Sequence, residues 1–311
     1  MRGFGLELPD EARQPPAMAL PKINLKAEVP HEIKTELAQT QWGKVLSLTP
    51  VVLTVISTLL AGLSSSEMTR AQYDRALAAQ RQSKAGDQWS FFQAKKLRGA
   101  MQRSALDVLR GTTEVSELDA AALAVFRDAP KPADPAAKFS PSVRAALDAQ
   151  ENSRPDAEMA TLLGKTSEAE LDTALRVAQD AAIAFDAAQK PLAAAIDERE
   201  HESSEGSSTA ARRRAVTAAR LDYLARRYDA EARLNQTIAG LLELQVRASN
   251  LSADRHHRRS GRFFYGMLAG QVGVIVATLA LAMQRRNLLW AIAACAGTIA
   301  LGFAAYVLVA L

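Results

Sequence analysis

The 311-residue chain has a single cysteine, and aromatic residues make up only 5% of it. One cysteine, Cys295, excludes both an internal disulfide framework and a zinc site built from several thiolates. Aromatic and β-branched residues, which favour strands, are scarce, whereas Ala, Leu, Arg and Gln, which favour helices, are abundant. The composition therefore predicts an all-α protein.

The chain also lacks a strong charge of either sign. Its formal net charge is +4 and its pI is about 9.2, a basic excess too small to indicate a nucleic-acid partner. Three long stretches contain no Asp, Glu, Lys, Arg or His at all. Ionisable residues inside a membrane mark ion and proton pathways, so their absence disfavours a self-contained transporter or pump.

These three stretches, residues 45–63, 263–283 and 288–311, predict transmembrane helices. Nineteen residues of helix reach roughly 28 Å, close to the thickness of a bilayer core. Residues 1–44 form a polar, Pro-rich amino-terminal tail before the first stretch. Only residues 284–287 separate the last two stretches, so these two helices must form an antiparallel hairpin. The sequence therefore predicts an integral membrane protein with three transmembrane helices.

Residues 64–262, between the first and second spans, carry helical patterns almost throughout. Apolar residues recur every three or four positions in two places. The first set is Phe91, Ala94, Leu97, Met101, Ala105 and Val108; the second is Leu221, Leu224, Tyr228, Leu234, Ile238 and Leu241. We expect the helix of the first span to pair with the helix that runs into the second span, forming a coiled-coil-like stalk.

Several positions predict breaks in this helical region. We expect one helix to stop at Gly111 and a short helix to follow over Glu114–Arg127. Four prolines define a linker over residues 128–142. Helix resumes beyond Pro155 to about Glu200, with a kink or boundary at Pro191.

A loop is then expected over His201–Ser208, with Ser207, Ser208 or Thr209 available to cap the next helix. Basic residues near the span ends are more numerous in the middle region than on the other side of the spans, which favours a cytoplasmic stalk.

Small residues share one face of the second span: Gly266, Gly270, Gly273 and Ala277. Such a face, which includes a GxxxG motif, allows another helix to approach closely. The motif is also common by chance in apolar sequence. If the surface is real, the packing partner is either in the same chain or in another membrane protein.

A basic cluster comes directly before this span: Arg255, Arg258, Arg259 and Arg262. It surrounds His256 and His257, whose side chains diverge by about 100° on a helix and so cannot share a metal ion without another element. We interpret the cluster as a membrane-surface patch that contacts the lipid bilayer. No catalytic triad or phosphate-binding loop is detectable, and we expect no enzyme activity, cofactor or metal.

The segment Gly86–Lys95, GDQWSFFQAK, is the most distinctive part of the polar region. Exposed aromatics beside polar groups are typical of binding hot spots, so the segment supplies candidate partner-docking residues: Asp87, Gln88, Trp89, Phe92, Gln93 and Lys95. The alternative is structural. Asp87 would cap a helix after Gly86, and Trp89 and Phe92 would be packing anchors.

Three blocks together resemble the DUF4337 family: GDQWSFFQAK, then RYDAEARLN at Arg227–Asn235, then the segment from Arg255 to Ala282. The resemblance covers roughly residues 45–311 and is weakest from the Pro-rich linker to about Glu200. It implies a bacterial membrane protein and supplies no catalytic residues.

Together these features predict a multi-pass protein of the bacterial inner membrane with a structural or interaction role. Its stalk would form a homo-oligomer or recruit a partner. The alternatives are an accessory subunit of a channel or transport system, docked on a membrane-protein partner, and, less favoured, a membrane-bound enzyme.

Overall fold

A computed structural model describes residues 41–118, 126, 129–205, 209–283 and 286–310. Its elements are α2 (Gln41–Thr112), the 3₁₀ helix η1 (Pro135–Lys138), α4 (Pro141–Glu151), α5 (Asp156–Lys165), α6 (Glu168–Glu205), α7 (Ala210–Ala282) and α8 (Arg286–Ala310). The described residues contain helices and no strand, so the predicted all-α class is confirmed.

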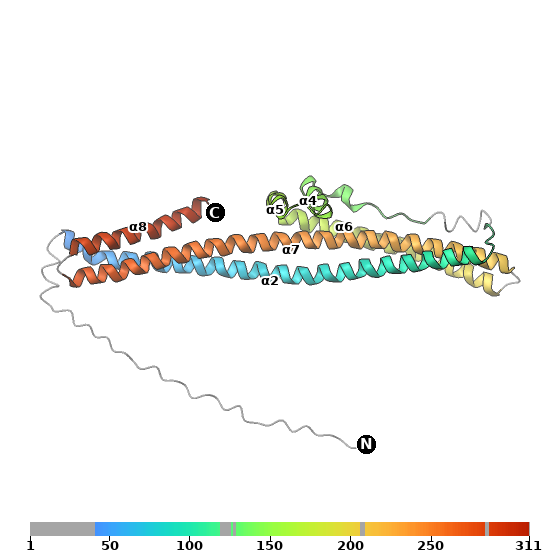
Figure 1. Ribbon diagram of the computed structural model, residues 1–311, viewed down its shortest axis with the longest axis horizontal. Helices are drawn as coiled ribbons and strands as arrows, with labels where there is room; N and C mark the ends of the chain where they lie inside the picture. Colours follow the sequence, from blue (N-terminus) through green and yellow to red (C-terminus); the bar gives the residue numbers. More distant parts are fainter. Residues whose placement is uncertain (1–40, 119–125, 127–128, 206–208, 284–285, 311) are drawn as a thin grey trace, which may run out of the picture.

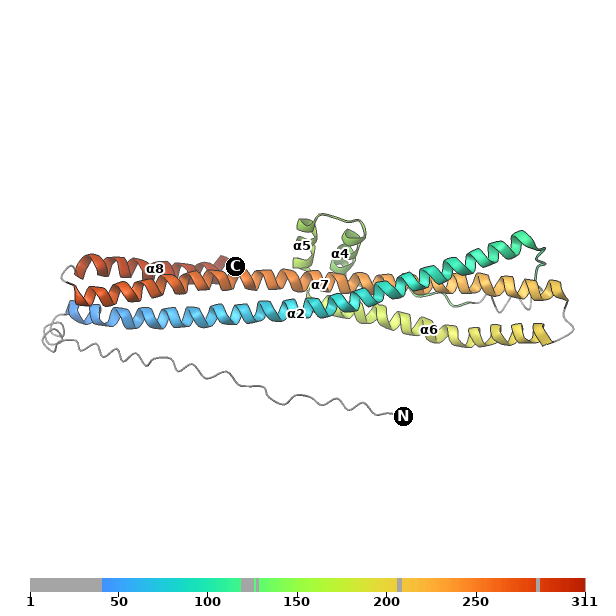
Figure 2. The ribbon, with the colours of Figure 1, turned by 60° about the horizontal axis from the view of Figure 1, so that its bottom comes forward.

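Two very long helices, α2 and α7, lie antiparallel and form a rod (Figure 1). They contain 72 and 73 residues, so each is about 110 Å long. The sequence predicted that the first and second apolar stretches each continue into a helix of the polar region. It also predicted that these two helices pair. Both predictions are confirmed. At one end α8 folds back along α7, and towards the other end α6 lies beside α7 (Figure 2).

Small residues at seven-residue intervals line the contact between the two long helices. On α2 the buried series is Ser57, Ser64, Ala71, Ala78 and Ala85, and it resumes at Gly99 after the half-buried Phe92. On α7 it is Ala218, Ala225, Ala232, Ala239, Val246, Ala253 and Ser260. A seven-residue repeat keeps one side of each helix facing its partner.

Gly99 marks how closely the two backbones approach. A Cβ atom added there would lie 3.5 Å from the Cβ of Tyr228 and 3.6 Å from the carbonyl oxygen of Ala225. Further along the rod, the Ser64 hydroxyl donates to the carbonyl of Ser260 at 3.0 Å, and the Ser260 hydroxyl donates to the carbonyl of Ser64 at 2.8 Å. Only small side chains permit these contacts.

Two helix starts follow the expected capping chemistry. The Thr209 hydroxyl accepts a hydrogen bond from the Arg212 amide at the start of α7. Thr209 is one of the three residues that the sequence predicts as possible caps of this helix. Before α6, the Ser167 amide donates to the Glu170 carboxylate at 2.8 Å, and the Glu170 amide donates back to the Ser167 hydroxyl, which forms a capping box. The bond from the Ser167 amide is the main reason that the pKa of Glu170 lies below its ordinary value.

Some predicted breaks are wrong. Glu114–Leu118 is not helical, because Val115 and Ser116 are poor helix formers directly after the end of α2; the rest of the predicted short helix lies outside the described residues, apart from Phe126. Of the loop predicted over His201–Ser208, His201–Glu205 belongs to α6, because neither glycine nor proline interrupts it; residues 206–208 lie outside the described residues. Pro191 lies inside α6, so the boundary predicted there as one of two alternatives is wrong.

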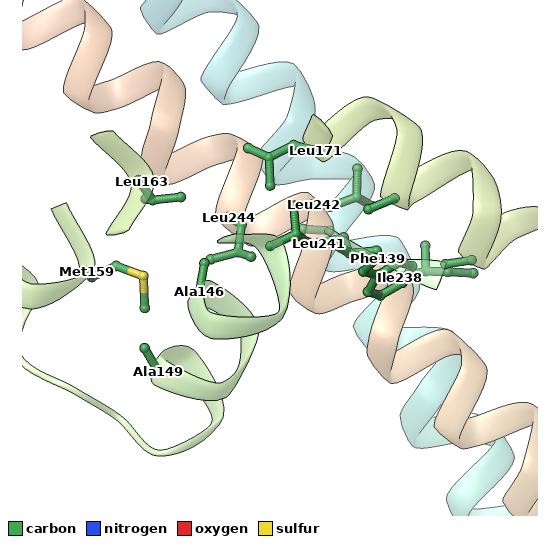
Figure 3. Close-up of a cluster of buried hydrophobic side chains, with 14 residues drawn as sticks. Phe139, Ala146, Ala149, Met159, Leu163, Leu171, Ile238, Leu241, Leu242 and Leu244 are labelled. Atoms are coloured by element: carbon green, nitrogen blue, oxygen red, sulfur yellow. The ribbon is translucent and has the colours of Figure 1, made fainter. Parts of the chain in front are cut away.

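The largest buried cluster joins the short helices to the rod (Figure 3). Side chains from α4, α5 and α6 meet those of α7 there: Val143, Ala146, Met159, Leu163, Leu171, Ile238, Leu241 and Leu244 are among its members. Because α4 and α5 are too short to be stable alone, this cluster is what fixes them against the side of α7.

In the described part of the chain, three helices are long and apolar enough to cross a membrane: α2, α7 and α8. Their apolar segments pack together at one end of the rod, with Leu53 and Leu60 of α2 buried against α7 and α8. Many apolar side chains on the outside of this bundle remain exposed, including Leu59 and Ile275.

Truncating Ile238 to alanine should destabilise the region where α4, α5 and α6 meet α7. Ile238 is 4% exposed, and removing a buried Ile side chain costs about 2–5 kcal/mol through lost burial and the remaining cavity. Ile183 on α6 is 68% exposed, so Ile183→Ala is a matched control that should change stability by about 0.5 kcal/mol or less. Denaturant unfolding of the purified protein, followed by circular dichroism, measures both. Equal losses would contradict the packing described here.

Candidate interaction surfaces

The segment Asp87–Lys95 lies in the middle of α2, so Asp87 begins no helix and the interpretation of Asp87 as a cap is wrong. Trp89 and Phe92 are half-buried and pack edge-to-face, with ring centroids 5.4 Å apart. Asp87 and Gln93 are exposed, and Gln88 is half-buried. The segment is therefore divided: Trp89 and Phe92 lie on the side that faces α7, whereas Asp87, Phe91 and Gln93 face outward.

Glu243 of α7 joins three helices at this level. Its carboxylate accepts a hydrogen bond from the Trp89 indole N–H of α2 at 2.6 Å. Its second oxygen accepts a hydrogen bond from the amide nitrogen of Gln150 in α4. A single carboxylate thus aligns α2 and the α4–α5 pair on α7. Sequence reasoning did not identify Glu243, because its partners are distant in the chain.

Glu231 of α7 is the acceptor in a second cluster of polar groups. This cluster includes Lys95, about two turns beyond Trp89 on α2. Glu231 is 8% exposed and forms ion pairs with Lys95 and with Arg227, whose Nε lies 2.7 Å away. Burial lowers the pKa of Arg227, but the hydrogen bond and negative charge of Glu231 outweigh this, and the pKa is raised overall. Lys95 also lies over the Tyr228 ring, 5.4 Å from its centroid.

A groove of about 800 Å³ lies between the linker around Pro130 and helices α6 and α7. Tyr223 is buried at its edge, and its hydroxyl donates to the Gln189 side chain at 2.7 Å. The Gln189 amide in turn donates to the Pro130 carbonyl at 3.0 Å. Burial raises the pKa of Tyr223, against the opposing charge of Arg227, so the phenol stays protonated as a donor. These bonds fasten the linker to the rod.

The apolar face predicted on α2 points away from α7. We call it the α2 stripe; its members are Phe91, Ala94, Leu97, Met101, Ala105 and Val108. All six are exposed, and the four largest, Phe91, Leu97, Met101 and Val108, are 55–63% exposed. The stripe extends over five helical turns, and no described part of the chain covers it.

The small-residue face of α7 packs within the chain. Gly266, Gly270, Gly273 and Ala277 are all buried. A Cβ atom at Gly273 would lie 3.1 Å from Leu53 of α2 and 3.3 Å from the carbonyl oxygen of Ala293 in α8. At Gly270 it would meet Ser57 of α2. Helices of the same chain therefore occupy this face, and it no longer provides a reason to expect another membrane protein there.

The basic cluster lies where the polar part of α7 meets its apolar part. Arg255, Arg258 and Arg262 are exposed and Arg259 is half-buried. Arg262 lies over the ring of Tyr306 of α8, 5.8 Å from its centroid. Nearby, His256 Nδ1 lies 2.5 Å from the Glu67 carboxylate of α2, so this histidine contacts α2 and not its neighbour His257. Within the described residues, no three His, Cys, Asp or Glu side chains are close enough to hold a metal ion.

The arrangement defines a class of protein: a long antiparallel helical rod with three apolar helices at one end. The family described as "Domain of unknown function (DUF4337)" matches residues 42–197, and the chain belongs to this family. The match includes GDQWSFFQAK and the Pro-rich linker, whereas the other two blocks of the resemblance, Arg227–Asn235 and Arg255–Ala282, lie outside it. No curated protein and no solved structure matches the chain.

Replacing Glu231 by leucine should destabilise the rod. The substitution removes the acceptor shared by Arg227 and Lys95, whose side chains are 21% and 27% exposed, and leaves Arg227 only the more exposed Asp186, 3.6 Å away. Unpaired, partly buried polar groups cost about 1–3 kcal/mol. Glu202→Leu breaks an ion pair that is exposed on both sides and should cost about 0.5 kcal/mol or less. Thermal unfolding of both variants compares the two losses, and a smaller loss for Glu231→Leu would contradict a structural role for the cluster.

Gly273→Leu should separate α7 from α2 and α8, because overpacking of this kind costs about 1–3 kcal/mol. A substitution at Gly270 tests the close contact less well, because the atom nearest to an added Cβ is the Ser57 hydroxyl, which can rotate away. Gly302 has no neighbour within 4 Å of an added Cβ, so Gly302→Leu is the control. The midpoint of thermal unfolding in detergent should fall for Gly273→Leu alone. A similar fall for both variants would show that leucine itself, and not the close contact, is responsible.

Proposed function

We propose that this chain is a membrane-anchored scaffold that self-associates through the α2 stripe. Helices α2, α7 and α8 cross the membrane, and the rest of α2 and α7 forms an antiparallel coiled-coil stalk. The role is structural and not catalytic. In keeping with the family resemblance and the distribution of basic residues, we place the protein in the bacterial inner membrane with its stalk in the cytoplasm.

The three apolar helix segments support the membrane anchor. Each is long enough to span a bilayer core of about 30 Å, and side chains around the outside of the bundle, such as Val55, Leu59 and Val272, are about half exposed or more. Exposed apolar surface of this extent is unfavourable in water and favourable in lipid. The seven-residue repeat of small buried residues along α2 and α7 supports the coiled-coil proposal.

The α2 stripe is the observation that carries the proposal of self-association. Leu97, Met101 and Val108 are each more than 60% exposed, although they lie beyond the apolar segments that enter the membrane. Burying one such side chain contributes about 1.5–3 kcal/mol. A continuous apolar stripe on the polar part of a protein is typical of a surface that binds another protein.

A second copy of the chain is the occupant that the geometry favours. Copies anchored in one membrane with the same orientation hold their α2 helices parallel and at the same height. Each stripe residue then meets its own counterpart, Met101 against Met101 and Leu97 against Leu97. The neighbouring positions agree with this register, because Gln93 on one side of the stripe would lie near Arg98 of the other copy, and no like charges are brought together.

Cysteine cross-linking tests this contact directly. Cys295 is the only cysteine, so a Cys295→Ser background leaves no other thiol. In that background, Met101→Cys should form an oxidised dimer in native membranes, because disulfides need Cα atoms about 4.4–6.8 Å apart. Ala100→Cys provides the control. Ala100 is also exposed but points about 100° away from Met101, so it should not cross-link.

Equal cross-linking of both cysteines would contradict the proposed contact. So would cross-linking of Met101→Cys only to a different protein, which would make the stripe a docking surface for another partner. As a second measurement, Met101→Asp should lower the dimer fraction of the purified protein roughly tenfold, since it removes about 1.5 kcal/mol of apolar burial. The helical content should not change, because Met101 is 61% exposed within one chain.

A further inference from the structure

One amide side chain lies on the outside of the apolar helix bundle. Gln271 belongs to the apolar segment of α7, residues 263–283, and it is exposed within one chain. It lies about 12 Å along the helix from Phe263 and about 18 Å from Met283. A glutamine side chain cannot reach the headgroup layer over these distances, as Lys and Arg side chains do near helix ends. With α7 inserted as proposed, the amide therefore lies in the hydrocarbon core.

The Gln271 amide differs from nearby hydroxyl groups on the outside of the bundle. The Thr278 hydroxyl donates to the carbonyl of Ile275 at 2.8 Å, and the Thr298 hydroxyl of α8 donates to the carbonyl of Cys295 at 2.8 Å. These hydroxyls are satisfied within their own helices, whereas the Gln271 amide has no hydrogen-bond partner among the described residues. An unsatisfied polar group in lipid carries a large free-energy penalty. Gln271 therefore requires a polar group from outside this bundle.

The residues around Gln271 form an exposed side of α7, which we call the Gln271 face. Phe264 precedes Gln271 by seven residues and Thr278 follows it by seven, so the three lie on one side of the helix. Leu268 and Ile275, about one turn before and after Gln271, complete the face and are 40% and 60% exposed. The glycines that contact α2 and α8 lie on the opposite side of α7. Neither of these helices therefore covers the Gln271 face.

We propose that the Gln271 face binds the same face of a second copy of this chain within the membrane. This inference rests on the proposed membrane anchor, and it adds an intramembrane contact to the contact through the α2 stripe. Copies inserted with the same orientation hold Gln271 at the same depth, and a two-fold axis along the membrane normal brings each residue against its own counterpart. A side-chain amide has both donors and an acceptor, so two facing glutamines can each donate to the oxygen of the other.

A second copy fits this face better than lipid or a different membrane protein does. Acyl chains contain no hydrogen-bonding group, and a different protein would need its own polar side chain at this depth. An identical copy inserted in the same direction always supplies that group. Hydrogen bonds of this kind between membrane helices contribute about tenfold to association, and the apolar side chains of Leu268 and Ile275 add packing around the amide pair.

Cysteine cross-linking within the membrane tests the geometry of this contact. In the Cys295→Ser background, Thr278→Cys should form an oxidised dimer in native membranes, because Thr278 lies on the Gln271 face. Val272→Cys is the matched control: Val272 is 53% exposed but points about 100° away from Gln271, so it should not cross-link. Equal cross-linking of both cysteines would overturn the proposal, and so would cross-linking of Thr278→Cys only to a different protein.

Self-association of the full chain in phosphatidylcholine vesicles tests the hydrogen bond itself. Energy transfer between donor-labelled and acceptor-labelled chains is measured at decreasing ratios of protein to lipid. Gln271→Leu should weaken association about tenfold, although leucine is the more favourable side chain in lipid. Gln271→Asn, which keeps the amide, should retain most of the association. The loss with Gln271→Leu should be the same in a Met101→Asp background, where the contact through the α2 stripe is weakened.

The outcomes separate this contact from the proposed function. Unchanged association of Gln271→Leu would overturn the proposal, whereas cross-linking of Met101→Cys in the same membranes would still support the α2 stripe. Release of the wild-type chain from membranes by alkaline carbonate would contradict the membrane anchor and would overturn this inference with it. Unchanged helical content of Gln271→Leu, as expected for an exposed position, excludes unfolding as the cause of weaker association.

Discussion

The close approach of α2 and α7 is the constraint on which the rest of the structure depends. Alanine, serine and glycine at seven-residue intervals permit it, but small residues alone do not define how the two helices are aligned. A slip of seven residues would again place small residues against small residues. The polar pairs between the helices remove that freedom, because Glu67 with His256, Lys95 with Glu231 and Trp89 with Glu243 can all form in one alignment only.

Once that alignment is established, the other elements have surfaces on which to pack. α8 contacts α7 where glycines keep the backbone accessible. The α4–α5 pair uses Gln150 to reach the carboxylate of Glu243, and α6 follows α7 through the cluster around Leu171 and Leu241. Short helices with little apolar surface thus gain their positions from the two long ones.

The sequence predicts the apolar segments and the two long helices that continue from them well, because uninterrupted apolar composition and helical periodicity are local properties. It is less informative about which side of α2 meets α7. Periodicity emphasises the large apolar side chains, here Leu97, Met101 and Val108, whereas the buried side is built from residues such as Ala78 and Ala85. In tightly packed helix pairs the buried side chains are small, so size and burial are no longer correlated.

The polar contacts of the candidate surfaces were also beyond sequence reasoning. Trp89 was recognised as unusual, but its hydrogen-bond acceptor lies 154 positions away, and no local pattern connects the two. The opposite problem arose at Gly266–Ala277, where the local pattern was clear but its packing partner was not. Only the fold shows that α2 and α8 occupy that face. Similarly, Glu114–Leu118 was expected to be helical from its surroundings, and its own residues prevented it.

The uninterrupted course of α2 and α7 has a mechanical consequence. Neither helix is broken between its apolar end and its far end, so the rod contains no joint at which bending or twisting could be absorbed. A torque applied at the far end is therefore transmitted to the apolar bundle about 70–80 Å away. Two continuous helices thus connect the far end of the rod to the apolar bundle.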